Sequence, residues 1–135
     1  MRLAPLLLPL VLAAMPLPQT QTLDGRAAVI LDGDMVAIGA ERIRILDIEA
    51  PGISEPECER EEIFALRSRQ RLAELVRSGP ITIQRSGRDR LGRTLARLFL
   101  ADGREIAAIL VAEGLALPWQ DSPEAKASRR QHWCG

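Results

Sequence analysis

The sequence predicts a small α+β fold in which five strands close into a barrel accompanied by about three helices. Two observations carry this prediction. Apolar residues alternate with polar ones in several short segments, which is the period of half-buried strands. Between the third and the fourth of these segments the apolar period lengthens to that of a helix. Three strands, a helix and two further strands fit a small closed barrel, a fold that recurrently binds nucleic acids and oligosaccharides.

The first three strands lie close together in the chain, and we expect them at residues 22–31, 35–38 and 42–48. Asp32 and Gly33 separate the first two and are a dipeptide of tight hairpins. In the third strand Arg42 and Arg44 alternate with isoleucines, so the period of two places both arginines on the face opposite the isoleucines. Pro51 cannot donate a ladder hydrogen bond and therefore ends this part of the sheet.

The next segment, residues 56–77, is predicted to be an amphipathic helix, because its apolar and small residues recur at helical spacing. A Gly-Pro pair at 79–80 stops it. A second helix is expected around residues 106–110. A short third helix is expected after Ser122, a favourable N-cap that is followed by a proline.

The two remaining strands are expected at residues 81–84 and 93–100, with an arginine-rich loop between them. Five arginines crowd into this part of the chain, at Arg85, Arg88, Arg90, Arg93 and Arg97. Guanidinium groups favour bidentate contacts with phosphate. The segment is therefore a candidate surface for an anionic ligand, and the plain alternative is an exposed basic hairpin.

Overall charge gives no such indication. The 135 residues include 18 basic and 18 acidic ones, so bulk charge does not point to a nucleic-acid binder. The low aromatic content, two Phe and two Trp with no Tyr, leaves few surfaces on which bases could stack. We therefore expect any binding of single-stranded DNA or RNA to be weak.

Residues 1–20 are predicted to be an export signal or, if uncleaved, an N-terminal membrane anchor, which leaves residues 21–135 as one domain. Arg2 followed by an apolar run is typical of such signals. At about 13 to 16 residues the run is shorter than the roughly 20 that a transmembrane helix needs. We expect an exported, periplasmic or secreted protein with no membrane contact in its mature form, acting as a monomer.

The chain has two cysteines, Cys58 and Cys134. An even number of cysteines behind an export signal favours one disulfide. The alternatives are two free thiols, or a Cys58 made reactive by the positive end of the following helix.

Residues 29–51 are the most informative segment. Asp34 and Glu49 offer hard oxygen ligands of the kind that Ca²⁺ or Mg²⁺ prefers, with Asp32 close by in the sequence. Arg44, between them, has the planar fork that holds two oxygens of a phosphodiester. The segment predicts a metal ion bound together with a phosphate.

Several motifs in this order resemble the thermonuclease family, whose best-known members are the staphylococcal-type nucleases. The matching strings are DGD at 32–34, RIRILDIEAP at 42–51, GRDRLGRTLARLFLADGR at 87–104 and LVAEGLALPW at 110–119. The resemblance covers about residues 22–134. It implies an OB-fold barrel with three helices, dependence on Ca²⁺ and hydrolysis of phosphodiesters in DNA and RNA.

The resemblance also implies the metal ligands. Asp34 and Glu49 match the carboxylates that bind Ca²⁺, the carbonyl of Ala50 matches a main-chain ligand, and Asp32 falls in the outer shell of the metal.

The substrate contacts follow in the same way. Arg44 and Arg93 match the catalytic pair that holds the scissile phosphate and stabilises its developing charge. Arg88 and Arg90 on the basic loop, and Trp119 near the region where the family places aromatic residues against a base, are candidate substrate contacts.

One departure concerns catalysis. Where the family has Asp-Thr-Pro-Glu, this chain has Glu49-Ala50-Pro51-Gly52. The missing glutamate is the residue usually assigned to the attacking water, and Glu55 or Glu57 is the nearest candidate replacement. Two hypotheses follow: a Ca²⁺-dependent endonuclease-type phosphodiesterase weakened at Gly52, or a catalytically inactive module that binds nucleic acid, another anionic ligand or a protein partner.

Overall fold

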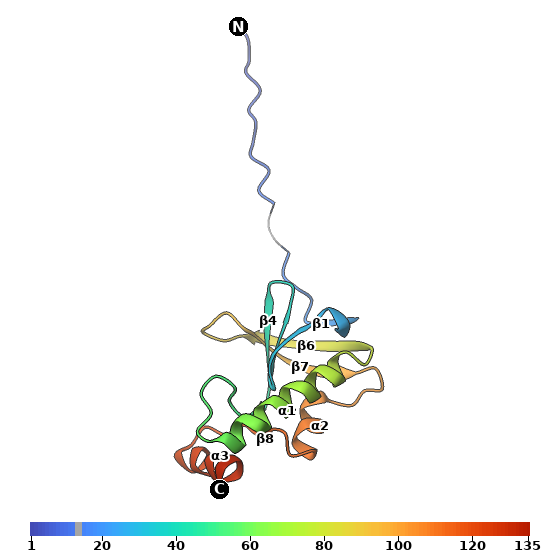
Figure 1. Ribbon diagram of the computed structural model, residues 1–135. Helices are drawn as coiled ribbons and strands as arrows, with labels where there is room; N and C mark the ends of the chain where they lie inside the picture. The colour runs from blue at the N-terminus through green and yellow to red at the C-terminus, as the bar shows by residue number, and fades with distance from the viewer. Residues whose placement is uncertain (13–14) are drawn as a thin grey trace.

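An extended N-terminal segment leads into a curved sheet with three α-helices packed beside it (Figure 1). The computed structural model describes residues 1–12 and 15–135. Residues 13–14 of the expected export signal lie outside this description, and the described residues before position 19 are neither helix nor strand. No helix in the described part of the chain is long and apolar enough to cross a membrane.

The strands are β1 (Thr20–Asp24), β2 (Val29–Asp32), β3 (Met35–Ile38), β4 (Glu41–Ile45), β5 (Ile48–Glu49), β6 (Pro80–Arg88), β7 (Thr94–Leu100) and β8 (Leu117–Pro118). The helices are the 3₁₀-helix η1 (Gly25–Ala27) and the α-helices α1 (Glu59–Val76), α2 (Ile106–Ala112) and α3 (Pro123–Cys134). The three predicted helices are therefore confirmed. Helix α1 begins three residues later than expected, with the sulfur of Cys58 accepting the N–H of Glu61 as an N-cap.

Six strands form one sheet in the order β1-β6-β7-β4-β3-β2, and β5 pairs with β8 separately. Neighbouring strands are antiparallel except β4 and β7, which run parallel. The edge strands β1 and β2 are joined by η1, so the chain brings the two edges back toward each other. No ladder joins these edges among the described residues. The predicted α+β OB-fold is confirmed, but pairing does not close its barrel.

Two predicted strands are each broken in two, and both breaks have a local cause. In the first, η1 interrupts residues 22–31 at Gly25, where an added Cβ would lie 1.8 Å from the carbonyl oxygen of Val76. Only glycine can pass so close to the end of α1. The second, residues 42–48, turns at Asp47, whose φ is 67°. Strand β6, in contrast, is longer than expected and extends beyond residues 81–84 as far as Arg88.

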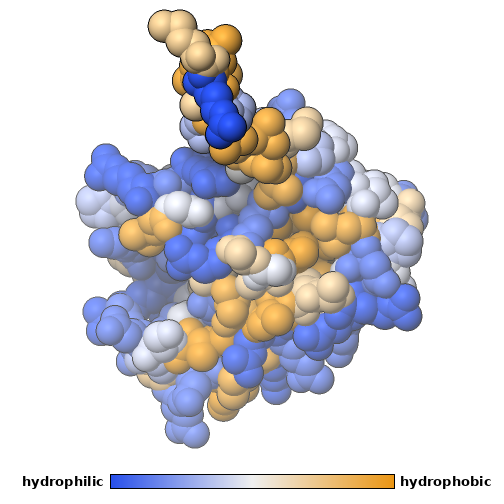
Figure 2. Space-filling view, turned by 90° about the horizontal axis from the view of Figure 1, so that it is seen from above, coloured by the Kyte–Doolittle hydropathy of each residue, from blue (hydrophilic) through white to orange (hydrophobic). Residues whose placement is uncertain are grey.

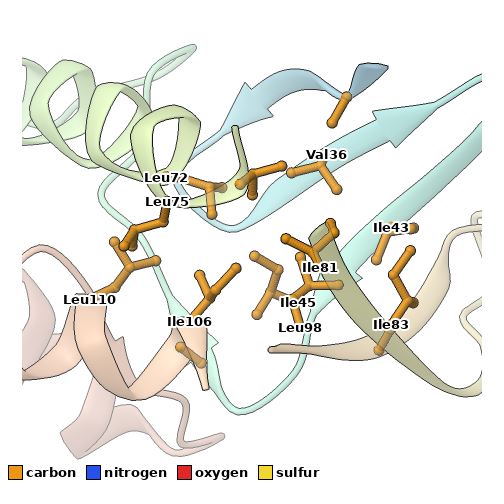
Figure 3. Packing of buried hydrophobic residues seen from close by; sticks show 14 of the residues in the cluster. Val36, Ile43, Ile45, Leu72, Leu75, Ile81, Ile83, Leu98, Ile106 and Leu110 are labelled. Carbon is orange, nitrogen blue, oxygen red and sulfur yellow. The ribbon is translucent and has the colours of Figure 1, made fainter. Parts of the chain in front are cut away.

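The interior is filled by aliphatic side chains from the sheet, α1 and α2. Strand β7 alternates strictly between buried and half-buried residues along its length. Figure 3 shows the cluster that results, with side chains of β3, β4, β6 and β7 facing those of both helices. Its largest fully buried members are Ile43, Ile45, Leu72, Ile81, Ile83, Leu98, Ile106 and Leu110. Because the core occupies the inside of the barrel, polar chemistry is confined to its outer face and its ends.

The N-terminal segment contrasts with this core. Its leucines at positions 3–12 are almost fully exposed, with Leu3 at 99% and Leu6 at 92%. Figure 2 looks onto the face from which the segment rises and shows its hydrophobic residues projecting from a surface of mixed hydropathy. The segment joins the domain near Pro18, whose carbonyl accepts a 2.8 Å hydrogen bond from Arg85.

Helix α3 is fastened to the start of α1 by the disulfide between Cys58 and Cys134, whose Cα atoms are 5.9 Å apart. The predicted disulfide is therefore confirmed, and the free-thiol alternatives are wrong. Trp133, 2% exposed, packs beside Phe64 with 5.3 Å between ring centroids. Arg60 also donates to the carbonyl of Gly135 at 2.9 Å.

Reduction of this disulfide is expected to lower the free energy of unfolding by about 2 to 4 kcal/mol, because the bond closes a long loop in the unfolded chain. Urea denaturation of the full chain with and without a reductant measures the change. The Cys58→Ser/Cys134→Ser double variant should match the reduced protein and not respond to the reductant. An unchanged urea midpoint on reduction would contradict a stabilising disulfide.

Candidate active site

The turn before β3 is seated against α1 and residue 50. Gly33 has no side chain, and an added Cβ there would lie 2.1 Å from Ser68 Oγ and 2.8 Å from the Cβ of Ala50. Ser68 itself is fully buried in α1. This close approach fixes the carboxylates on either side of the glycine, Asp32 and Asp34, at one end of the barrel.

Asp34 and Arg44 form the centre of the predicted site. The Oδ2 of Asp34 accepts a 2.9 Å hydrogen bond from the N–H of Ala50 and lies 3.4 Å from Arg44 Nη1. Arg44 also donates to the carbonyls of Ile45 and Ile48 at 2.7 and 2.8 Å. Both side chains are largely buried, at 14% and 17% exposed. The guanidinium is thus held by main-chain oxygens and does not depend on a ligand for its orientation.

Asp32 has an unsatisfied carboxylate. Its Oδ1 is buried without a hydrogen-bond partner among the described residues. Burial raises the pKa of Asp32, and the nearby negative charge of Asp34 raises that pKa further. Two neighbouring carboxylates with an unpartnered oxygen suit a hard cation. These two carboxylates have the donor chemistry of a calcium site, but among the described residues no group of three or more acidic, histidine or cysteine side chains could hold a metal as they stand.

Glu49, the other predicted carboxylate ligand, is directed toward α3. Its Oε2 lies 2.7 Å from Arg129 Nε. This contact is an ion pair and not an aligned hydrogen bond, since the same oxygen is buried and has no hydrogen-bond partner among the described residues. Ala50 contributes its N–H to Asp34. Neither Arg129 nor its pairing with Glu49 could be expected from the sequence, because the two residues are 80 positions apart and share no motif.

The two predicted catalytic arginines line one cavity of about 380 Å³ together with Trp119. Arg93 reaches it from the start of β7 and Arg44 from β4, which are neighbouring parallel strands. Trp119 is 50% exposed, and its main-chain N–H donates to the carbonyl of Asp47 at 2.8 Å. The structure thus brings together three residues that are far apart in the sequence.

Asp89 orients Arg93, a role that the sequence analysis missed. Its Oδ2 accepts a 2.6 Å hydrogen bond from Arg93 Nε, and its Oδ1 accepts the N–H groups of Leu91 and Arg93 at 2.9 Å. Desolvation favours a higher pKa for Asp89, but these hydrogen bonds outweigh it and leave the pKa below its ordinary value. The spacing of four residues in a tight turn was the only available signal.

The other arginines of the basic segment divide into two groups. Arg85 and Arg97 are paired with acids, the first with Glu41 at 2.8 Å and the second with Glu105 at 3.2 Å. The predicted substrate contacts Arg88 and Arg90 are exposed, at the end of β6 and in the following turn. The basic segment is therefore partly structural and partly available to a ligand.

The departure from the family motif lies in a second cleft. Gly52, Glu55 and Glu57 line a space of about 530 Å³ together with Glu49 and residues of α3. Glu57 is paired with Arg130 at 3.0 Å. An added Cβ at Gly52 would have its nearest neighbour, the carbonyl oxygen of Glu55, at 3.7 Å, which is ordinary contact. The position therefore has room for a side chain.

Fold and site together define a class: small OB-fold proteins that place arginines beside carboxylates at one end of an incompletely closed barrel. A family model described as staphylococcal nuclease homologue matches residues 42–133. The chain belongs to the staphylococcal nuclease family. The match includes Arg44, Glu49 and Arg93, whereas the turn with Asp32 and Asp34 precedes it.

Individual relatives agree with this assignment. The chain is 36% identical to a micrococcal nuclease of Shigella flexneri in an alignment of 104 residues that covers 68% of this chain and 56% of the relative. It is 30% identical to an uncharacterized endonuclease of Escherichia coli O157:H7 over 96 residues, 68% and 58% of the two chains. It is also 32% identical to the succinoglycan biosynthesis protein ExoI of Rhizobium meliloti (strain 1021) over 102 residues, 69% and 50%. The chain thus spans about half the length of the curated relatives that it matches.

Proposed function

We propose that this protein is a Ca²⁺-dependent, endonuclease-type phosphodiesterase that hydrolyses single-stranded DNA or RNA. The observation that carries the proposal is the cavity that Arg44, Arg93 and Trp119 line together, with the carboxylate of Asp34 next to Arg44. The nuclease names of two relatives agree with it.

In this proposal the arginines bind and orient the phosphate. Each guanidinium can donate two hydrogen bonds to non-bridging oxygens. Arg44 is held by the carbonyls of Ile45 and Ile48, and Arg93 by Asp89, so both donors are in place before the charge on the phosphate grows. Donors fixed in this way stabilise the transition state more than the ground state.

Asp34, Asp32, Glu49 and the carbonyl of Ala50 are the proposed calcium ligands and their immediate neighbours. The buried and unpartnered Oδ1 of Asp32 supports a cation at this place. When bound, Ca²⁺ would neutralise phosphate charge and favour the deprotonated form of a nearby water. Asp34 is held by the Ala50 N–H, which keeps its carboxylate aimed at one place.

The weak point of the site is the activation of water. In-line attack forms a bond from the water oxygen to phosphorus, breaks the bond to the leaving oxygen and requires the water to lose a proton. Gly52 can accept no proton, so solvent or Glu55, which lines the same cleft, must take it. General-base catalysis contributes about 10²- to 10⁴-fold. The proposed enzyme is therefore slower, by a factor in that range, than the same site would be with an acid at position 52.

The exposed side chains near the cavity are the proposed substrate contacts. Trp119 offers half of its surface for stacking on an unpaired base, and Arg88 and Arg90 offer exposed charge to neighbouring phosphates. Stacking on one aromatic side chain contributes about 1 to 3 kcal/mol, so affinity for single strands should be modest and sensitive to salt.

We further propose that the protein is exported to the periplasm or secreted, and acts as a monomer. The disulfide between Cys58 and Cys134 supports an oxidising compartment. The exposed apolar residues before β1 support removal of residues 1–20 as a signal.

A second function is favoured by one observation, the glycine at position 52. Without a water-activating acid, the same arginines and Trp119 could bind nucleic acid, another anionic ligand or a protein partner without cleaving anything. Both functions predict binding, and only the first predicts turnover.

Labelled single-stranded DNA and RNA, incubated with the full chain and Ca²⁺, separate the two. The phosphodiesterase should yield shortened products on a denaturing gel. The binding module should raise the fluorescence anisotropy of the label, in a salt-dependent way, and leave the strand intact. Intact strands after long incubation at saturating protein would contradict the proposed activity.

A further inference from the structure

Helix α3 pairs the guanidinium group of Arg129 with Glu49, one of the proposed calcium ligands. Arg129 Nε lies 2.7 Å from Glu49 Oε2, and the two side chains are 16% and 34% exposed. Glu49 is the residue before Ala50, whose N–H holds Asp34. Glu49 is therefore next in sequence to a residue that contacts Asp34, but its own carboxylate is paired with an arginine from the C-terminal helix.

This pairing leaves Glu49 incompletely satisfied. Its Oε2 is buried and receives no aligned hydrogen bond from the part of the chain that the structure describes, although Arg129 is close to it. Arg129, in contrast, keeps a separate hydrogen bond from Nη1 to the carbonyl of Gln120 at 2.9 Å. If the side chain of Glu49 turned away, Arg129 would keep its hydrogen bond to Gln120. The carboxylate of Glu49 could then replace its poorly aligned contact with Arg129 by a contact with a metal ion.

Arg129 is also held in place from several directions. The disulfide between Cys58 and Cys134 fixes the end of α3, and the buried ring of Trp133 packs against Phe64. These contacts hold the part of α3 that contains Arg129, which itself lines the same cleft as Glu49 and Gly52. They thereby hold the charge of Arg129 beside Glu49.

We propose that Arg129 is a positioning residue that occupies Glu49 as a resident counter-ion and competes with the divalent cation for its carboxylate. The inference rests on the proposed function, because it takes Glu49 to be a calcium ligand. Two positive groups cannot both be closely paired with one carboxylate without repelling each other. Calcium affinity is therefore lower than the acidic residues alone would give, and the seating of α3 sets how much lower.

The test is calcium binding by the full chain, measured by isothermal titration with CaCl₂ and no nucleic acid. Arg129→Gln removes the charge while keeping much of the side-chain length. It is expected to tighten the dissociation constant for Ca²⁺ by about fivefold, the upper end of the range for an exposed ion pair, because Arg129 is largely buried. Arg129→Lys retains the charge and should bind Ca²⁺ within about twofold of the wild type.

Arg130→Gln is the matched control. Arg130 is the next residue of α3, and it pairs with Glu57 instead of Glu49. Its removal changes the net charge of the protein by the same amount and should leave calcium affinity unchanged. Circular dichroism of each variant confirms that α3 and the rest of the fold are intact.

Unchanged or weaker calcium binding by Arg129→Gln would overturn the inference, and so would an equal gain in Arg130→Gln. If the wild type binds Ca²⁺ and cleaves DNA but Arg129→Gln matches it, only the competition is wrong. If neither the wild type nor Arg129→Gln binds Ca²⁺, the inference and the calcium dependence of the proposed function both fail.

Discussion

Replacing Arg93 with alanine is expected to lower the rate of single-strand cleavage by about 10²- to 10³-fold, the usual effect of removing one fixed donor from a developing oxyanion. Arg93 lines the same cavity as Arg44 and is already oriented by Asp89, so its loss removes a prepared contact. The measurement is the initial rate at saturating Ca²⁺ and substrate.

Arg104→Ala serves as the control for Arg93→Ala. Arg104 is also an arginine beside an aspartate in a tight turn, pairing with Asp102 at 2.9 Å, but it is 65% exposed and does not line the cavity. Its rate should equal that of the wild type. Equal cleavage by Arg93→Ala and the wild type would show that the arginine assignment is wrong.

Restoring an acid at position 52 is expected to have an effect of similar size in the opposite direction. Gly52→Glu should raise the cleavage rate by about 10²- to 10⁴-fold, which is the usual contribution of a general base. The substitution is sterically open, since an added Cβ meets no atom closer than 3.7 Å, and the side chain would extend into the cleft beside Glu49. Single-turnover rates with labelled single-stranded DNA measure the gain.

Gly52→Gln separates a proton acceptor from a side chain that merely fills the cleft. It has nearly the same size as glutamate and no basic carboxylate, so its rate should stay at the wild-type level. A gain shared by both variants would point to packing of the loop and contradict the role assigned to the missing acid. A Gly52→Glu variant that binds Ca²⁺ but cleaves no faster than the wild type would also contradict that role.

Periodicity predicted the parts of the fold that depend on one buried face. Helix α1 and strand β7 have clear apolar periods and lie within one to three residues of their expected bounds. The breaks at Gly25 and Asp47 could not be predicted in this way, because they depend on the approach of α1 and on a single positive φ. The apolar period of a segment indicates which of its own residues are buried, but it does not indicate which other element will pack against them.

The site was predictable to the extent that its residues belong to a motif. Arg44 and Arg93 were expected to act together, and they line one cavity. The partners that hold or occupy these residues were missed. Asp89 acts through a turn, and Arg129 reaches Glu49 from a helix at the other end of the chain. The first pair had only a spacing of four residues as a signal, and the second, between residues 80 positions apart, had none.

The central claim is that carboxylates and arginines at one end of the barrel form a calcium-dependent phosphodiesterase. The most direct test is to remove metal ions with a chelator and then titrate Ca²⁺ while measuring single-strand cleavage by the full chain and by Asp34→Asn. We expect the wild type to lose activity in chelator and regain it saturably with Ca²⁺, and Asp34→Asn to be slower by more than about 10²-fold. Cleavage that persists in chelator, or an Asp34→Asn variant with the wild-type rate and calcium response, would contradict the claim.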